Sequence, residues 1–256
     1  MISMKNINKG ISGSNLKIIA AVTMLIDHIG FLLLGYGVLQ MFPGSTRQYS
    51  EWYGVYHLMR CVGRVAFPIY AFLLTEGIAH TRDWKKYGLR LGIFAVLSEI
   101  PFDLMCFQKP ICGETQNIFF TLLIGLLTVE AAEYAARKIS GEKIILVWIT
   151  TGTCGCIAAV LLRTDYDYIG ILLIVLLYLL RERRIGQCVA GFFWISANLS
   201  GIGFLLGVAV SFLLIGIYNG ERGNKRGKYI FYIFYPVHLL VLYLIYQWLM
   251  QNIGKF

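Results

Sequence analysis

Two adjacent polar residues interrupt the apolar segment MLIDHIGFLLLG, which covers residues 24–35. Ionisable side chains are costly inside a bilayer and commonly mark functional sites there. Histidine is the side chain best suited to take up and return a proton near neutral pH. Asp27 and His28 point about 100° apart on a helix, so we expect Asp27 to pair with a cation and His28 to face a cavity. A histidine that only hydrogen-bonds within the core is the alternative.

Further ionisable residues lie at similar depths in other apolar segments. Arg60 and Arg64 are spaced i,i+4, as are Glu99 and Asp103, so each pair shares one face of a helix. At 1.5 Å per residue, Asp27, His28, Arg64 and Glu99 lie about 16–21 Å from one end of their segments. The arginines can therefore pair with Glu99 and Asp103, or with Asp27. On either interpretation these charges can also be ion pairs that only stabilise the bundle.

Three prolines lie close to these ionisable residues. Pro68 follows Arg64 in RCVGRVAFPIYAFLLTEG, and Pro101 separates the two carboxylates in SEIPFDL. Pro236 precedes His238 in FYPVHLL, about 12 Å into the last apolar segment. Proline removes a helical hydrogen bond, and interrupted helices in membranes line protein interiors or cavities. Because each proline lies close to an ionisable residue, we expect these helices to line a cavity rather than only to bend.

The elements that must position these residues are membrane-spanning helices. The chain is 57% hydrophobic and only 14% charged, with a mean hydropathy of +0.66, whereas soluble domains carry about 25% charged residues. Nine apolar runs approach the roughly 20 residues that cross a bilayer. They are 16–39, 55–78, 87–107, 117–134, 144–162, 166–180, 185–198, 201–218 and 229–250. The sequence predicts an all-α polytopic membrane bundle of about nine spans, in one domain of residues 1–256.

The positive charges indicate the orientation of this bundle. If all nine runs span, 16 of the 23 Lys and Arg residues lie on the side of the amino terminus, four on the other side and three within spans. Cytoplasmic loops collect Lys and Arg, so the amino terminus is predicted to be cytoplasmic and the carboxyl terminus outside. The net charge of +9 is then a topology signal, and nucleic acid is not expected as a partner. The first run is too long for a cleavable signal peptide and has no cleavage site after it.

The six cysteines show no metal-binding spacing, so no metal is expected. Cys106 and Cys112 lie near the outer face, where a disulfide between them is possible.

Four segments resemble the TraX family, named for the F-pilin acetylation protein of conjugative plasmids. They are LKIIAAVTMLIDHIG, the stretch from Arg60 to Leu104, QNIFFTLLIGLL and FYPVHLL. The resemblance covers residues 16–125 and the end of the chain, while residues 135–220 are generic apart from YDYIGILLI. Its specific motifs are Asp-His, Gly-Arg-x-x-Phe-Pro and Ser-Glu-x-Pro-Phe-Asp.

The resemblance implies a membrane acetyltransferase that uses cytosolic acetyl-CoA, in a bacterial cytoplasmic membrane. His28 would act as the general base or carry the acetyl group. Arg64 or Arg60 would stabilise the developing oxyanion. Asp27 and Glu99 would set the ionisation of His28 and of the arginines. The segment HTRDWKKYGLR would hold the phosphates through His80, Arg82, Lys85, Lys86 and Arg90, or would serve only as a topology signal. Residues expected to contact the acceptor are Arg60, Asp103, Asn117, Thr121, Tyr166 and His238.

The acceptor itself stays open, as a peptide amine, a sugar, a lipid head group or a polymer. A proton-coupled transporter is the main alternative, since midplane ionisable residues and interrupted helices also suit it. That class usually has duplicated halves, and the sequence shows no such repeat. A membrane scaffold with only structural charges is the other alternative.

Overall fold

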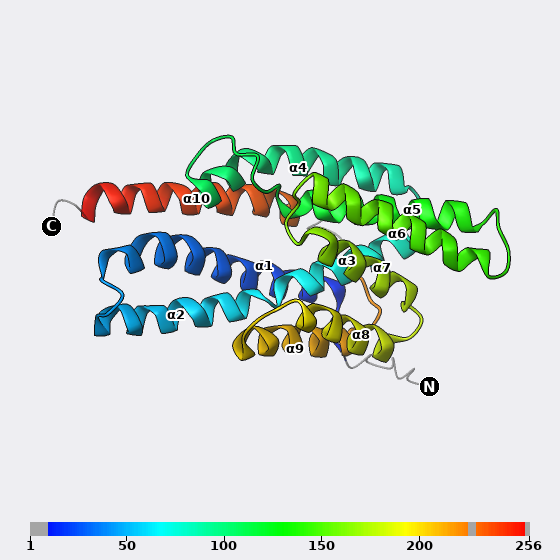
Figure 1. The fold of residues 1–256 in the computed structure, drawn as a ribbon, viewed down its shortest axis with the longest axis horizontal. Helices are drawn as coiled ribbons and strands as arrows, with labels where there is room; N and C mark the ends of the chain where they lie inside the picture. Colours follow the sequence, from blue (N-terminus) through cyan, green and yellow to red (C-terminus); the bar gives the residue numbers. More distant parts are fainter. Residues whose placement is uncertain (1–9, 225–228, 254–256) are drawn as a thin grey trace, which may run out of the picture.

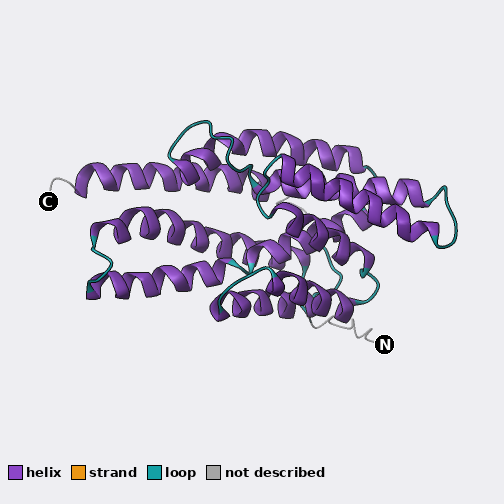
Figure 2. Ribbon diagram, viewed as in Figure 1, coloured by secondary structure: helices purple, strands orange, loops and turns teal. Residues whose placement is uncertain are grey.

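The computed structural model describes residues 10–224 and 229–253 as helices joined by loops, with isolated β-bridges from Ile11 to Tyr218 and from Gln116 to Thr164. The predicted all-α class is confirmed for these residues, which contain no strand (Figure 2). Six of the basic residues in the topology count lie outside the described residues: Lys5, Lys9, Lys225, Arg226, Lys228 and Lys255.

The first helical stretch changes its hydrogen-bonding pattern near the polar pair. Helix α1 (Gly13–Ile29) starts after Ser12, whose hydroxyl accepts a hydrogen bond from the N–H of Asn15. It continues directly into the π-helix η1 (Gly30–Gly37) and the 3-10 turn η2 (Val38–Met41). A π segment within a helix is frequent at functional sites, and this one begins two residues after His28.

The second stretch is broken where the sequence predicts an interruption. Helix α2 (Arg47–Gly63) is followed by i→i−3 hydrogen bonds at Arg64 and Val65, and helix α3 (Ala66–His80) begins directly after them. Pro68 is the third residue of α3, where a missing N–H costs no helical hydrogen bond. The break before Pro68 therefore accommodates the proline, and Arg64 lies in the turn between α2 and α3.

The other two prolines do not interrupt their helices. Pro101 lies within α4 (Trp84–Phe107), and Pro236 lies within α10 (Ile230–Ile253). These two helices pack against each other, and α10 also contacts α1 and η1. The prediction that all three prolines mark broken helices is thus confirmed only for Pro68.

Five further helices complete the described part of the chain. They are α5 (Ile118–Ala136), α6 (Lys143–Leu161), α7 (Asp167–Leu179), α8 (Arg184–Ala197) and α9 (Ile202–Gly216). Figure 1 shows the α5–α6 hairpin at the right end, whereas α1, α2 and α10 extend to the left end. Helix α3 lies between the two groups and contacts α1, α5, α7 and α9.

Among the residues that the structure describes, five helical stretches are long and apolar enough to cross a membrane: Gly13–Met41, Arg47–His80, Ile118–Ala136, Lys143–Leu161 and Ile230–Asn252. Helices α7 and α9 are apolar but shorter, and α8 has 14 residues. Helix α4 has sufficient length but carries several charges along it, including Lys85 and Asp103. Each predicted run coincides with helix, and the count of nine spans stays a prediction.

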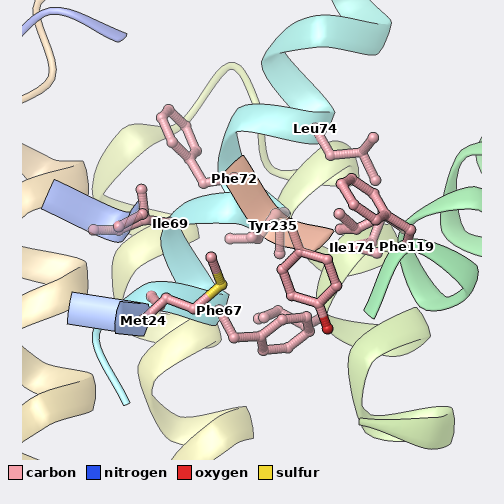
Figure 3. Packing of buried hydrophobic residues seen from close by; sticks show 14 of the residues in the cluster. Met24, Phe67, Ile69, Phe72, Leu74, Phe119, Ile174 and Tyr235 are labelled. Carbon is pink, nitrogen blue, oxygen red and sulfur yellow. The ribbon is translucent and has the colours of Figure 1, made fainter. Parts of the chain in front are cut away.

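The packed interior centres on α3. Phe67, Ile69, Phe72 and Leu74 are almost fully buried. Figure 3 shows them with Met24, Phe119, Ile174 and Tyr235, which reach the same cluster from α1, α5, α7 and α10. By contrast, α6 and α10 expose rows of large apolar side chains, including Leu146, Ile149, Leu244 and Trp248. Such apolar outer faces fit contact with lipid rather than water.

Candidate functional site: a cavity that reaches a histidine pair

One cavity connects the polar residues of α1 with a cluster of positive charge. It has a volume of about 590 Å³ and lies among α1, α3, α4, α5 and α10. Its apolar wall includes Met24, Phe67 and Phe119 of the cluster in Figure 3. Both Asp27 and His28 line it, as predicted for His28.

Asp27 is held by the two arginines of the second helical stretch. Its Oδ2 accepts a hydrogen bond from Nη1 of Arg60 at 2.7 Å, and its Oδ1 lies 3.7 Å from Nη2 of Arg64. The side chains are only 15–19% exposed. Gly63 makes this approach possible, because a Cβ there would overlap the Asp27 carboxylate. Of the two pairings left open by the sequence, the one with Asp27 is observed.

The pairing of the arginines with Glu99 and Asp103 is therefore wrong. Helix α2 packs against α1 and α9, whereas α4, which carries both carboxylates, packs against α5 and α10. Glu99 instead accepts hydrogen bonds from the backbone and side-chain amides of Asn117. Asp103 accepts one from the backbone N–H of Cys112 at 2.6 Å. Neither carboxylate lines the cavity.

His28 has a partner that the sequence did not indicate. Its Nδ1 lies 2.8 Å from Nε2 of His238 in α10, and the two rings are nearly parallel, with 13° between their planes. Nδ1 of His238 lies 2.7 Å from the carbonyl oxygen of Phe234. We call His28 and His238 the histidine pair. His238 is buried and does not line the cavity, so its predicted contact with an acceptor is not supported by its position.

The opposite end of the cavity is cationic and open to solvent. Of the predicted phosphate-binding residues, His80, Arg82 and Arg90 line it, together with Lys17 and Arg222. His80, Arg82 and Arg222 are exposed, which places the mouth of the cavity at this end. Arg90 lies over the ring of Tyr87, and its Nε is buried without a hydrogen-bond partner in the described part of the chain.

Lys85 and Lys86 do not line the cavity, contrary to the expected phosphate site. They occupy the exposed first turn of α4, where Lys86 pairs with Asp83 at 3.1 Å and Lys85 lies over the ring of Trp84. The backbone N–H of Lys86 also donates to Asp83, and this bond holds the pKa of Asp83 below its ordinary value. These two lysines therefore belong to the first turn of α4, whose N-cap residue is Asp83.

The loop between α6 and α7 supplies Asp165 and Tyr166 to the deep end of the cavity. Tyr166 was predicted to contact the acceptor, and its ring stacks on Phe67 with centroids 3.6 Å apart. Asp165 was missed, although a carboxylate between two apolar runs was a detectable signal. Arg163, Tyr166 and Asp167 all have positive φ, and such strained backbone clusters at functional sites.

The remaining predicted residues have structural contacts. Asn117 caps α5 through the N–H of Phe119, and its amide also bonds the carbonyl of Ala95. The Thr121 hydroxyl donates to the carbonyl of Asp165, so Thr121 fixes the loop behind the cavity. Cys106 and Cys112 are free thiols, and no group of His, Cys, Asp or Glu among the described residues is arranged to hold a metal.

The fold and the site together define a polytopic helical membrane protein whose internal cavity joins a cationic mouth to the histidine pair. Its sequence matches the model of the TraX family, described as "TraX protein", over residues 12–246. The chain therefore belongs to the TraX family.

A relative from Dichelobacter nodosus carries the name "Probable fimbrial assembly protein FimC, serogroup H1". It is 28% identical over an alignment of 264 residues, gaps included, and the alignment covers 92% of this chain and 96% of the relative. No solved structure matches this fold.

Proposed function

We propose that the protein is a membrane acetyltransferase that moves an acetyl group from acetyl-CoA to an amine or hydroxyl acceptor. The observation that carries this proposal is the continuous cavity from the cationic mouth to His28. Lys17 at the mouth and His28 share helix α1 and are eleven residues apart, or about 16 Å along the axis. A long flexible arm that carries a thioester suits this shape, with its charged end held at the mouth.

The phosphates of acetyl-CoA would be held by His80, Arg82 and Arg90. Guanidinium groups bind phosphate oxygens through strong charge-assisted hydrogen bonds. The unpartnered Nε of Arg90 supports an anionic ligand here, because a buried donor without an acceptor is costly. Lys17 and Arg222 add positive charge at the same mouth.

At the deep end, His28 would take the proton from the acceptor as its nitrogen or oxygen attacks the thioester carbon. The new C–N or C–O bond replaces the C–S bond, and the proton passes from His28 to the departing CoA thiolate. In the covalent variant the His28 nitrogen attacks the thioester carbon first and the C–S bond breaks, which releases the CoA thiolate. The acceptor then displaces His28 from the acetyl group, and the acceptor's proton passes to the thiolate. Both routes use the same cavity and give the same products, the acetylated acceptor and CoA with its thiol protonated.

The other expected catalytic residues receive positioning roles in this proposal. Arg60 and Arg64 do not line the cavity, and their observed partner is Asp27 rather than an oxyanion. They hold the Asp27 end of α1 against α2. Glu99 anchors the start of α5 through Asn117 and does not reach the reacting groups.

The name of the relative from Dichelobacter nodosus, a probable fimbrial assembly protein, favours a fimbrial subunit as the first acceptor to test. A peptide with a free amino terminus would present the required amine. Because the proposed donor is cytosolic, we place the protein in the bacterial cytoplasmic membrane with the mouth facing the cytoplasm.

The test is calorimetric titration of acetyl-CoA into the protein in nanodiscs. The double variant Arg82→Ala/Arg90→Ala should lose at least about tenfold in affinity, because two charge-assisted hydrogen bonds are removed. The matched control Lys85→Ala/Lys86→Ala removes the same charge outside the cavity and should bind like the wild type. His28→Ala should bind acetyl-CoA but transfer no acetyl group. Wild type that is folded and does not bind acetyl-CoA would overturn the proposal.

One observation favours a proton-coupled transporter as a second candidate. Oε1 of Glu99 and Oδ1 of Asp103 are buried without hydrogen-bond partners in the described part of the chain. Carboxylates in membrane helices often carry protons in transporters. Proton uptake by liposomes that contain the protein, abolished by Glu99→Gln, would support that alternative over acetyl transfer.

A further inference from the structure

A chain of two short contacts joins His28 to the backbone of α10. Nδ1 of His28 meets Nε2 of His238 at 2.8 Å, and Nδ1 of His238 meets the Phe234 carbonyl at 2.7 Å. Each contact is a good hydrogen-bond distance. The order of donors and acceptors along this chain decides where the protons of both rings lie.

The carbonyl end of the chain sets that order. A carbonyl oxygen only accepts hydrogen bonds, so Nδ1 of His238 must carry a hydrogen. A neutral imidazole has one N–H, which makes Nε2 of His238 an acceptor. Nδ1 of His28 is then the donor to it, and Nε2 of His28 is left with its lone pair.

The surroundings favour the neutral form of both rings. In the described part of the chain neither ring hydrogen-bonds a carboxylate, since Asp27 is taken by Arg60 and Arg64. Phe234 and Tyr235 pack on His238 with ring centroids 4.5 and 5.7 Å away. Burying an unpaired charge in such a place costs far more than burying a neutral ring.

Nε2 of His28 is also the nitrogen that is free to react. It makes no hydrogen bond within the described residues and is not among their buried unpartnered atoms, while its residue lines the cavity. Its lone pair is therefore available to a molecule in that cavity.

We propose that His238 is a positioning residue that holds His28 in its Nδ1–H tautomer and so presents the Nε2 lone pair to the cavity. The reaction at Nε2 rests on the proposed acetyl transfer, whereas the tautomer does not. The role is that of the carboxylate that orients the base in a Ser-His-Asp triad. A neutral ring, unlike a carboxylate, fixes the tautomer without neutralising an imidazolium.

The direct test is ¹⁵N NMR of the protein in nanodiscs with labelled histidine. The chain has four histidines, which single substitutions assign. In wild type, Nδ1 of His28 should show the protonated type of shift and Nε2 the unprotonated type. The His238→Met variant removes the acceptor and should move His28 toward the Nε2–H tautomer. A wild-type His28 with hydrogen on Nε2 would overturn the proposal, whatever the protein catalyses.

Kinetics supply the second readout. His238→Met should lower kcat for acetyl transfer about 10²-fold, with unchanged acetyl-CoA affinity, because the base has the wrong tautomer. His238→Gln, whose side-chain oxygen can accept from Nδ1 of His28, should recover much of that loss. His57→Gln, which changes a histidine outside the cavity, is the control and should behave as wild type. Equal loss in the Met and Gln variants would contradict a tautomer role and leave only a packing role for His238.

Discussion

At the scale of single residues, Asp27 and His28 adjoin in sequence but belong to different networks. Asp27 turns to the arginines of the second helical stretch, and His28 turns to His238 and the cavity. The ion pairs join α1 to the second helical stretch, while His28 lines the cavity. Asp27 is thus expected to matter for stability as well as for any activity.

Asp27→Asn should destabilise the protein by about 3 kcal/mol, because breaking a buried ion pair leaves guanidinium charges without compensation. The measurement is reversible denaturation in detergent, followed by tryptophan fluorescence. The control is Glu51→Gln, which breaks the exposed pair with Arg47 and should cost no more than about 0.5 kcal/mol. Equal effects of the two variants would show that Asp27 is not held as described.

At the scale of elements, close packing of helices brings the site together. Glycines at the contacts let α1 approach α2 at Gly63, and let α9 approach α2 at Gly207, where a Cβ would overlap the carbonyl of Cys61. Small residues at such positions are a general feature of helix packing in membranes. Beyond the break before Pro68, α3 contacts α1, α5, α7 and α9.

Gly63→Ala should push α1 from α2 and weaken the bond between Arg60 and Asp27. We expect a lower midpoint of thermal unfolding and reduced transfer activity. Gly54→Ala is the matched control in the same helix, because nothing lies within 4 Å of its Cβ. That variant should be neutral or stabilising by about 0.5–1 kcal/mol. If Gly63→Ala behaves like Gly54→Ala, the close approach is not required.

At the scale of the whole molecule, the helices are unequal in length. Helix α7 has 13 residues and α8 has 14, or about 20 Å each, which is less than the roughly 30 Å of a hydrocarbon core. The loop between α6 and α7 reaches the cavity, where Asp165 and Tyr166 form part of the wall.

Reporter fusions test the predicted orientation. Alkaline phosphatase, active only outside the cytoplasm, should be active when fused after residues 44, 113 and 200 and inactive after residues 82, 141 and 182. This pattern follows from nine spans with a cytoplasmic amino terminus. Fusions after 182 and 200 that report the same side would show that α8 does not cross the membrane. Inactivity after residue 44 would reverse the assigned orientation.

The sequence by itself determined the membrane class, the helical elements and the cationic segment near His80, because hydropathy and charge are local properties of the chain. It also placed His28 correctly at a cavity and Arg60 and Arg64 near an acidic partner. The TraX motifs identified the family from residues in the first half and the last helix. Hydropathy, charge and motifs can all be read without knowledge of which helices are neighbours.

Only the tertiary structure decided which of the equally deep charges meet. Arg60 contacts Asp27 instead of Glu99 because α2 packs on α1 while α4 packs on α5 and α10. Likewise, His28 and His238 are 210 residues apart, and Asp165 enters the cavity from a loop. Depth along a helix follows from residue number, but the neighbour across a contact depends on the packing of the whole bundle, which no local pattern contains.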